Sequence, residues 1–196
     1  ACLNEFVEGG HPQCAVNPRT AFEEEYTREI PKAEKKKYVA VIGSGPAGVV
    51  AAETLIKRGH AVDLYEKGEI GGNLVPGSKA QIKYEVKNYL DYLKKTVENL
   101  KKNENFEFIK ATAIAENLKA KSYDAILVAT GTVQSKPKVE GIDSDNVVFA
   151  TDVLNNPKLV KDAQNIVVIG GGVVGAETAY FLKYELDKDV KVVEMG

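Results

Sequence analysis

Apolar and polar positions alternate along this chain in two distinct patterns. Short apolar runs of strand length lie at residues 38–42, 61–65, 106–109, 111–115, 125–129, 166–169 and 190–193. Longer stretches between them carry apolar residues at helical spacing, most clearly 83–102, with Val86, Tyr89, Leu90, Leu93, Val97 and Leu100. Strands that alternate with helices predict an α/β fold built on parallel sheets.

The remaining segments suggest three parts. Residues 1–17 read as irregular, 18–31 as acidic and partly helical, and 32–37 as a basic linker. A connection punctuated by Pro137, Gly141 and Pro157 runs over 135–157 and leads from the first strand–helix unit to the second. We therefore expect an N-terminal segment and linker at 1–37, a first unit at 38–157 and the start of a second unit at 158–196.

The same glycine motif occurs in both units. Residues 43–48 read Gly-Ser-Gly-Pro-Ala-Gly, and residues 170–175 read Gly-Gly-Gly-Val-Val-Gly. Each motif follows an apolar run and opens a helical stretch, which leads to a second apolar run that ends in an acid, Glu66 or Glu194. The first glycine lies 23 residues before the acid in one copy (43 to 66) and 24 in the other (170 to 194).

This arrangement is that of a dinucleotide-binding unit. The first glycine permits a tight turn, the second lets the backbone approach a diphosphate, and the third lets the helix pack against its strand. The helix N-terminus favours an anion, and the acid accepts hydrogen bonds from an adenosine ribose. An ordinary glycine-rich turn is the alternative, and the complete context of both copies argues against it.

Composition narrows the class of protein. The chain has 196 residues, 44% of them apolar and 28% charged, with a net charge of −2. That balance suits a soluble domain with a buried core and argues against nucleic-acid binding. No apolar run approaches the roughly 20 residues of a membrane span, and no secretory signal is visible. We expect a cytoplasmic protein, and we expect the chain to be an interior part of a longer one.

Cysteine usage restricts the redox chemistry. The chain has two cysteines, Cys2 and Cys14. Flavin enzymes that reduce a disulfide need a cysteine pair near the flavin, and residues 15–196 contain none. Electrons must therefore go elsewhere. Cys2 and Cys14 are the visible soft ligands, and a disulfide or a pair of ordinary thiols is the alternative.

Further motifs in fixed order resemble a known family. They are Cys2-x11-Cys14-x2-Asn17-Pro18, the two glycine motifs, Arg58-Gly59-His60, Leu64-Tyr65-Glu66-Lys67, Gly71-Gly72, Ala129-Thr130-Gly131, Asp152-Val153-Leu154, Glu177-Thr178-Ala179 and Val193-Glu194-Met195. Over essentially the whole chain they resemble the C-terminal portion of the iron–sulfur flavoenzymes related to 2,4-dienoyl-CoA reductase, 2-enoate reductase and trimethylamine dehydrogenase. The resemblance implies two Rossmann-like units of the disulfide-reductase-type flavoprotein fold, the second truncated.

The resemblance also implies a set of cofactors and ligands. Cys2 and Cys14 match two of the four thiolates of a [4Fe–4S] cluster, and the other two lie outside this chain. An N-terminal TIM barrel of the same parent protein holds FMN in this family. For FAD the implied residues are Gly43, Gly45, Pro46, Ala47, Glu66, Lys67, Gly71, Gly72, Asn73, Leu74, Ala129, Thr130 and Gly131. For NADH they are Gly170, Gly172, Val173, Val174, Gly175, Glu177 and Glu194.

The implied function is electron input. NADH reduces FAD, and electrons pass through the cluster to FMN, which reduces an activated C=C bond of a small-molecule substrate of the enoate or enoyl-CoA type. Two alternatives stay open: a non-redox module that binds ADP, as in trimethylamine dehydrogenase, and a reductase subunit like the small subunit of glutamate synthase. We expect a homo-oligomer without nucleic-acid or membrane partners. We identify no catalytic acid or base, and we expect His60 at the surface.

Overall fold

A four-stranded parallel sheet forms the first part of the structure. The computed structural model describes residues 4–26 and 29–195. Strands β1 (Tyr38–Ile42), β2 (Ala61–Tyr65), β3 (Phe106–Ile109) and β4 (Ala125–Val128) lie in the order β3-β2-β1-β4. The register pairs Tyr38 with Ala61 and Ile42 with Tyr65. The carboxyl ends of β1 and β2 therefore meet at one edge, where the first glycine motif begins.

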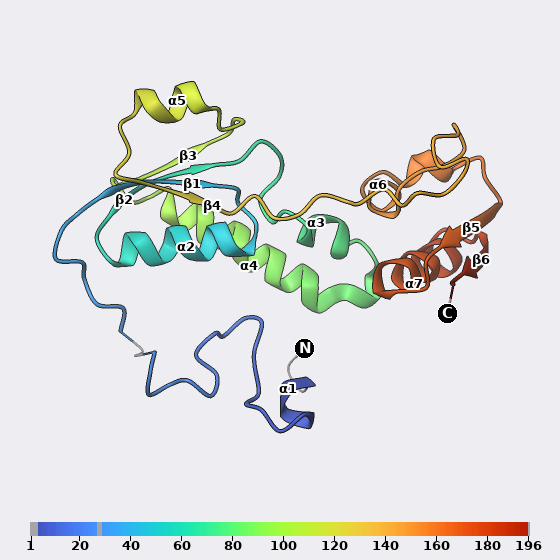
Figure 1. Cartoon of the computed structure of the whole chain (residues 1–196), viewed down its shortest axis with the longest axis horizontal. Coiled ribbons are helices and arrows are strands. Elements are labelled where there is room, and N and C mark those ends of the chain that lie inside the picture. Colours follow the sequence, from blue (N-terminus) through green and yellow to red (C-terminus); the bar gives the residue numbers. More distant parts are fainter. Residues whose placement is uncertain (1–3, 27–28, 196) are drawn as a thin grey trace.

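Helices cover the two faces of this sheet unequally. Helices α2 (Pro46–Lys57) and α4 (Tyr84–Leu100) lie on one face, and the short α5 (Ala115–Ala120) lies on the other (Figure 1). The main core fills the α2–α4 side, with Val39 and Val41 of β1 and Val62 and Leu64 of β2 pointing into it. Because side chains alternate along a strand, Tyr38, Asp63 and Tyr65 belong to the opposite face.

A second, smaller unit follows a long connection. After β4 the chain runs in an extended path to α6 (Ala150–Asn155) and the 3₁₀ turn η2 (Pro157–Val160) (Figure 1). Strands β5 (Asn165–Ile169) and β6 (Asp189–Val193) then pair in parallel, joined by α7 (Val173–Tyr180) and the π-helical η3 (Phe181–Glu185). Val153, Val160 and Leu182 form its small core.

The two units touch through the segment between α3 (Leu74–Gly77) and α4, which includes the 3₁₀ turn η1 (Gln81–Lys83). Ala80 packs against Leu154 and Phe181 in a separate apolar cluster. Polar contacts flank this cluster, because Lys83 forms an ion pair with Glu177 and the Gln81 N–H donates to the Glu185 carboxylate at 2.7 Å. The second unit therefore packs directly against the first.

Several expectations about elements are confirmed and others are wrong. The predicted strands at 38–42, 61–65, 106–109, 166–169 and 190–193, and the long helix near 83–102, are present within a residue or two. The described part of 18–31 contains turns and no helix, and 111–115 forms no strand, because the chain turns there into α5. A short helix α1 (Asn4–Val7) lies in the segment expected to be irregular. His60 is buried, since its Nδ1 accepts the Lys37 N–H at the entry to β1.

Candidate dinucleotide sites

The first glycine turn has the geometry that close approach to a diphosphate requires. Gly43 has a φ of +102°, and a Cβ there would lie 2.4 Å from the Ala129 carbonyl oxygen. A Cβ on Gly48 would lie 1.8 Å from the Gly43 carbonyl oxygen, so this glycine alone lets α2 start against the turn. A Cβ on Gly45 would meet nothing within 4 Å. Open space therefore lies over the backbone at the N-terminus of α2, where Pro46 begins the helix.

The second turn repeats this geometry. Gly170 has a φ of +103°, and Gly172 precedes α7 with φ −65° and ψ 179°, against −69° and −177° for Gly45 before α2. A Cβ on Gly175 would lie 1.8 Å from the Gly170 carbonyl oxygen, the same distance as in the first copy. The two motifs are therefore one backbone structure built twice, and Val173 and Val174 open the second helix as Pro46 and Ala47 open the first.

The acid of each unit reaches back to the turn of the same unit. Glu66 Oε2 accepts hydrogen bonds from the N–H and the hydroxyl of Ser44, both at 2.8 Å, and Oε1 accepts the Gly68 N–H at 2.7 Å. Partial burial raises the pKa of Glu66, but these bonds from Gly68 and Ser44, helped by the charge of Lys110, leave it below its ordinary value. Glu66 is therefore ionised near neutral pH and held beside the turn.

Glu194 takes the same position in the second unit. Its Oε2 accepts the Gly171 N–H and its Oε1 accepts the Met195 N–H at 2.8 Å. These backbone hydrogen bonds, from Gly171 first and then Met195, lower the pKa of Glu194. A hydroxyl like that of Ser44 is missing here, because glycine occupies the matching position.

The turn that follows β2 closes over the first motif. The Gly71 N–H donates to the Ser44 carbonyl at 2.9 Å, and a Cβ on Gly72 would come within 3.3 Å of the Gly45 Cα. Asn73 then donates from its side-chain amide to the Thr132 hydroxyl at 3.3 Å. This contact joins the turn to the segment after β4. The expected flavin segments Gly71–Asn73 and Ala129–Gly131 therefore lie close to each other.

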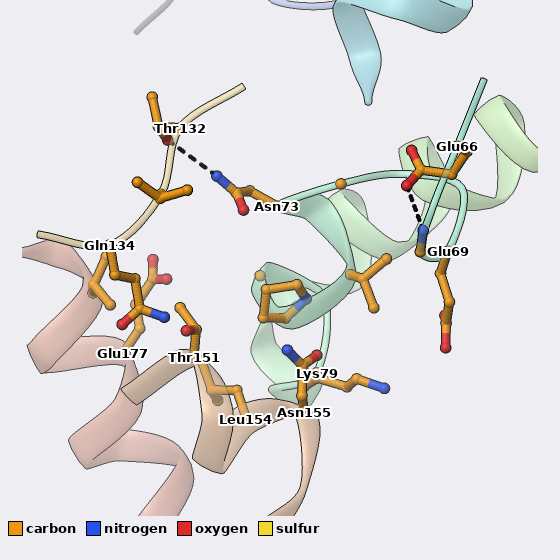
Figure 2. A pocket seen from close by; sticks show the side chains of 17 residues that line it. Glu66, Glu69, Asn73, Lys79, Thr132, Gln134, Thr151, Leu154, Asn155 and Glu177 are labelled. Carbon is orange, nitrogen blue, oxygen red and sulfur yellow. Dashed lines mark hydrogen bonds between the residues drawn. The ribbon is translucent and has the colours of Figure 1, made fainter. Parts of the chain in front are cut away.

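A cavity of about 760 Å³ extends from the first unit to the second. Glu66 and Glu69 stand at one side of it and Thr132, Gln134 and Glu177 at the other, with Asn73 between them (Figure 2). Both units contribute to its lining, and Val174 and Glu177 come from α7. The cavity is large enough for an extended cofactor with one end near Glu66.

Five of the residues expected for the two cofactors line this cavity. Glu66, Gly72, Asn73, Val174 and Glu177 line the cavity, while Lys67 and Leu74 follow and precede lining residues along the chain. Glu177 also pairs with Lys83 of the first unit, a contact that the sequence did not suggest. The lining residues that sequence reasoning missed are Gly68, Glu69, Val75, Pro76, Gly77, Lys79, Thr132, Val133, Gln134, Thr151, Leu154 and Asn155.

Of the two expected cluster ligands, Cys14 can be described. It is a partly exposed free cysteine that lines a separate cavity of about 360 Å³ with Thr20, Phe22 and Tyr26. Hydrogen bonds from the Val16 and Asn17 backbone, in that order, lower its pKa, which favours the thiolate that metals require. Cys2 lies outside the described residues. Within 4–26 and 29–195, no three His, Cys, Asp or Glu side chains gather as a metal site.

Comparison with known proteins places the chain in a family. Residues 37–196 match the pyridine nucleotide-disulphide oxidoreductase family. The chain belongs to this family. Its fold class is thereby confirmed, and the match implies a part of an oxidoreductase that binds FAD and a pyridine nucleotide. The family's name includes a disulfide, yet this chain has no cysteine after Cys14.

Individual relatives indicate which members of the family this chain resembles. A cinnamate reductase of Clostridium sporogenes is 39% identical over 99% of this chain and 28% of its own length. An NADH oxidase of Thermoanaerobacter brockii is 39% identical over 93% of this chain and 28% of its length. A solved 2-naphthoyl-CoA reductase superposes with a TM-score of 0.86 at 33% identity, over 98% of this chain and 29% of that protein. The resemblance to enoate and enoyl-CoA reductases is confirmed, and the chain spans less than a third of these relatives.

None of the helices found in 4–26 and 29–195 combines the length and the apolar character that crossing a membrane requires. Ser44, to which the sequence analysis assigned no role, is fully buried and donates its hydroxyl to Glu66. A small polar residue beside the glycines was the available signal for this role.

Proposed function

We propose that this chain is the electron-input portion of an NADH-dependent flavin and iron–sulfur oxidoreductase, with FAD in the first unit and NADH in the second. When bound, the flavin accepts a hydride from NADH and can release electrons singly toward a [4Fe–4S] cluster. The observation that supports this proposal most directly is the continuous cavity from Glu66 to Glu177. Each of the two units beside the cavity contributes a glycine turn of the kind that binds a diphosphate.

The residues of the chain divide the binding work between the two units. Backbone N–H groups at the start of α2 and α7 face the open space above Gly45 and Gly172, where an anionic diphosphate is stabilised. The carboxylates of Glu66 and Glu194 lie where an adenosine ribose can donate hydrogen bonds to them. The segment from Gly71 to Asn73 and Thr132 then extends the first site beyond a diphosphate.

That extension supports FAD over ADP in the first site. An ADP molecule needs the glycine turn and Glu66, and nothing more of the cavity. The Asn73–Thr132 contact and the cavity beyond it form a continuous surface toward Glu177. We assign this surface to the flavin end of FAD, which places the flavin between the units and within reach of a nicotinamide held by α7.

The proposal also covers the iron–sulfur cluster, the FMN-binding barrel and the substrate. We propose that Cys14, with Cys2 and two cysteines outside this chain, holds the cluster, and that FMN in a TIM barrel of the parent protein reduces an activated C=C bond. The names of the cinnamate and naphthoyl-CoA reductases support this substrate class. The glycine-flanked cofactor sites supply electrons, so substrate selection belongs to the barrel.

Release of the bound nucleotide tests this assignment. The full-length protein that contains this chain is purified, denatured and its nucleotides separated by chromatography. We expect FAD in a ratio of about one per chain, since there is one site of this kind. Recovery of ADP and FMN with no FAD would support the ADP-binding module and contradict the proposal.

A further inference from the structure

Asp63 is a buried carboxylate on the face of the sheet that lies opposite the main core. Its side chain is 4% exposed, and one oxygen, Oδ2, accepts three hydrogen bonds. The donors are the Tyr38 hydroxyl at 2.7 Å, the Tyr123 hydroxyl at 2.5 Å and the Lys121 ammonium at 2.7 Å. A buried charge is tolerated when it is paired and hydrogen-bonded in this way.

The tyrosine hydroxyls form a chain with one direction. The Tyr65 and Tyr123 hydroxyl oxygens lie 2.8 Å apart. Each hydroxyl has one proton, and Tyr123 gives its own to Asp63, so Tyr65 must donate to Tyr123. Burial, followed by the hydrogen bond to Asp63, raises the pKa of Tyr123, which keeps this proton in place. The direction is therefore Tyr65 to Tyr123 to Asp63.

An unusual backbone conformation presents two of these donors. Ser122, between Lys121 and Tyr123, has a φ of +52°, a left-handed conformation that non-glycine residues rarely adopt. Both neighbours reach Asp63, and Lys121 also binds Glu107 of β3 at 2.9 Å. Hydrogen bonds and ion pairs therefore hold the turn before β4 against strands β2 and β3 of the sheet.

This Asp63 cluster, defined as Asp63, Tyr38, Tyr65, Lys121 and Tyr123, connects to the first nucleotide turn on the β2 side. Tyr65 is the last residue of β2, and its carbonyl accepts the Gly43 N–H at 2.8 Å. The next residue is Glu66. A hydrogen bond that holds the Tyr65 side chain therefore acts on both the turn and the acid.

A second connection runs through β4. Asp124 follows Tyr123, and its carboxylate accepts the Tyr38 N–H at 2.7 Å. From there β4 leads to Ala129, whose carbonyl lies directly against Gly43. The two strands that frame the glycine turn are consequently tied to the same buried carboxylate.

We propose that Tyr123, acting through Tyr65, is a positioning residue for the adenosine end of the first nucleotide site. The inference rests on the proposed binding of FAD there. Tyr123 is not among the residues that line the cavity; it fixes the carboxyl end of β2, and through it Gly43 and Glu66. Tyr38 supplies the comparison, because it donates to the same Asp63 oxygen but has no contact with the Tyr65 hydroxyl.

The test compares Tyr123→Phe with Tyr38→Phe in the full-length apoprotein titrated with FAD. Each change removes one hydroxyl that donates to Asp63 and keeps the ring. We expect the Kd for FAD to rise about fivefold in Tyr123→Phe, the size of one lost hydrogen bond, and less than about twofold in Tyr38→Phe. Tyr123→Phe loses two hydrogen bonds and Tyr38→Phe loses one, so the melting temperature should fall further in Tyr123→Phe. Tyr65→Phe removes the Tyr65–Tyr123 contact and leaves both bonds to Asp63, so it shows whether the Kd follows that contact and not the loss of stability.

A double-mutant cycle completes the test. Tyr65→Phe should reproduce the Kd of Tyr123→Phe, and combining the two should add nothing, since both remove the same hydrogen bond. Equal Kd increases in Tyr38→Phe and Tyr123→Phe, or no increase in Tyr123→Phe, would overturn the inference alone. A wild-type apoprotein that fails to bind FAD would overturn the proposed function, and this inference with it.

Discussion

Ser44 donates two hydrogen bonds to a single oxygen of Glu66, one from its N–H and one from its hydroxyl, both at 2.8 Å. The acid that is expected to receive the ribose is thus held at the turn that is expected to receive the diphosphate. Gly171 and Glu194 repeat the backbone half of this contact in the second unit. The ribose and diphosphate positions of each site are therefore fixed relative to each other before a ligand binds.

Replacing the acid should weaken binding at the first site. Glu66→Gln keeps the size of the side chain but exchanges one acceptor oxygen for an NH₂ group, which cannot accept from Ser44, Gly68 and a ribose together. We expect the Kd for FAD to rise about tenfold, because hydrogen bonds to a charged group are lost. Glu104→Gln, in an exposed turn, is the matched control and should leave the Kd unchanged; an equal effect of both changes would contradict the role of Glu66.

The lowered pKa of Glu66 predicts a dependence of stability on pH. The folded-state pKa lies below the ordinary value of 4.5, so the ionised carboxylate contributes stability above that pH. This contribution is lost as the pH falls through the folded-state pKa. Thermal melts between pH 6 and pH 3, values chosen as roughly bracketing a carboxylate titration, should show a smaller decrease for Glu66→Gln than for the wild type. Parallel decreases would show that Glu66 does not contribute.

The two third-position glycines give a paired test of the two sites. A methyl group at Gly48 or at Gly175 would lie 1.8 Å from the carbonyl of the first glycine in its turn. We expect Gly48→Ala to yield protein without FAD, and Gly175→Ala to yield protein that retains FAD but is no longer reduced by NADH. Each variant serves as the control for the other, and loss of FAD from both would show that the second turn is not a separate nicotinamide site.

Glu194 should set the preference for NADH. Its carboxylate ends β6 beside Gly171, where a ribose hydroxyl can donate to it and a 2′-phosphate is repelled. We expect kcat/KM for NADH to exceed that for NADPH by at least about tenfold, because like charges a few ångströms apart repel even when screened. Glu194→Ala should reduce this ratio. A wild-type preference for NADPH, or an unchanged ratio, would contradict the assignment.

Cys14 should be required for iron binding. In the full-length protein, Cys14→Ala removes one of four proposed thiolates and should lower the iron content markedly. Reduction of an artificial dye by NADH should persist, while reduction of the natural acceptor is lost. Thr20→Ala, beside Cys14, retains all four thiolates and is the control. Full iron content in Cys14→Ala would refute the cluster assignment.

Sequence patterns predicted the framework because glycine spacing and apolar periodicity act locally. The helix with Leu90, Leu93 and Val97 buries those residues as its spacing requires. Long-range polar contacts had no such signal. Asp63 stands within an apolar run and accepts a hydrogen bond from Tyr123, which is distant in the chain, and the buried His60 accepts the N–H of Lys37, which is also distant. The acids Glu66 and Glu194 were placed correctly at strand ends, but their bonds to the turns were not foreseen.

The ion pair of Glu177 is another long-range contact that the sequence did not predict. Its place on α7 was visible from the second glycine motif, whereas its ion pair with Lys83 depends on how the second unit sits on the first. The apolar contact between the two units is made by Ala80, Leu154 and Phe181, which belong to three separate elements or turns. No periodicity along the chain reports a contact of that kind.

Anaerobic mixing of the full-length protein with NADH tests the central claim most directly. The account predicts that the visible absorbance of the flavin bleaches on mixing, with more than one NADH consumed per FAD, since a hydride carries two electrons and the FAD passes electrons on to the cluster and FMN. Flavin absorbance that stays unchanged in excess NADH would contradict the assignment of this chain as the electron-input portion of the enzyme.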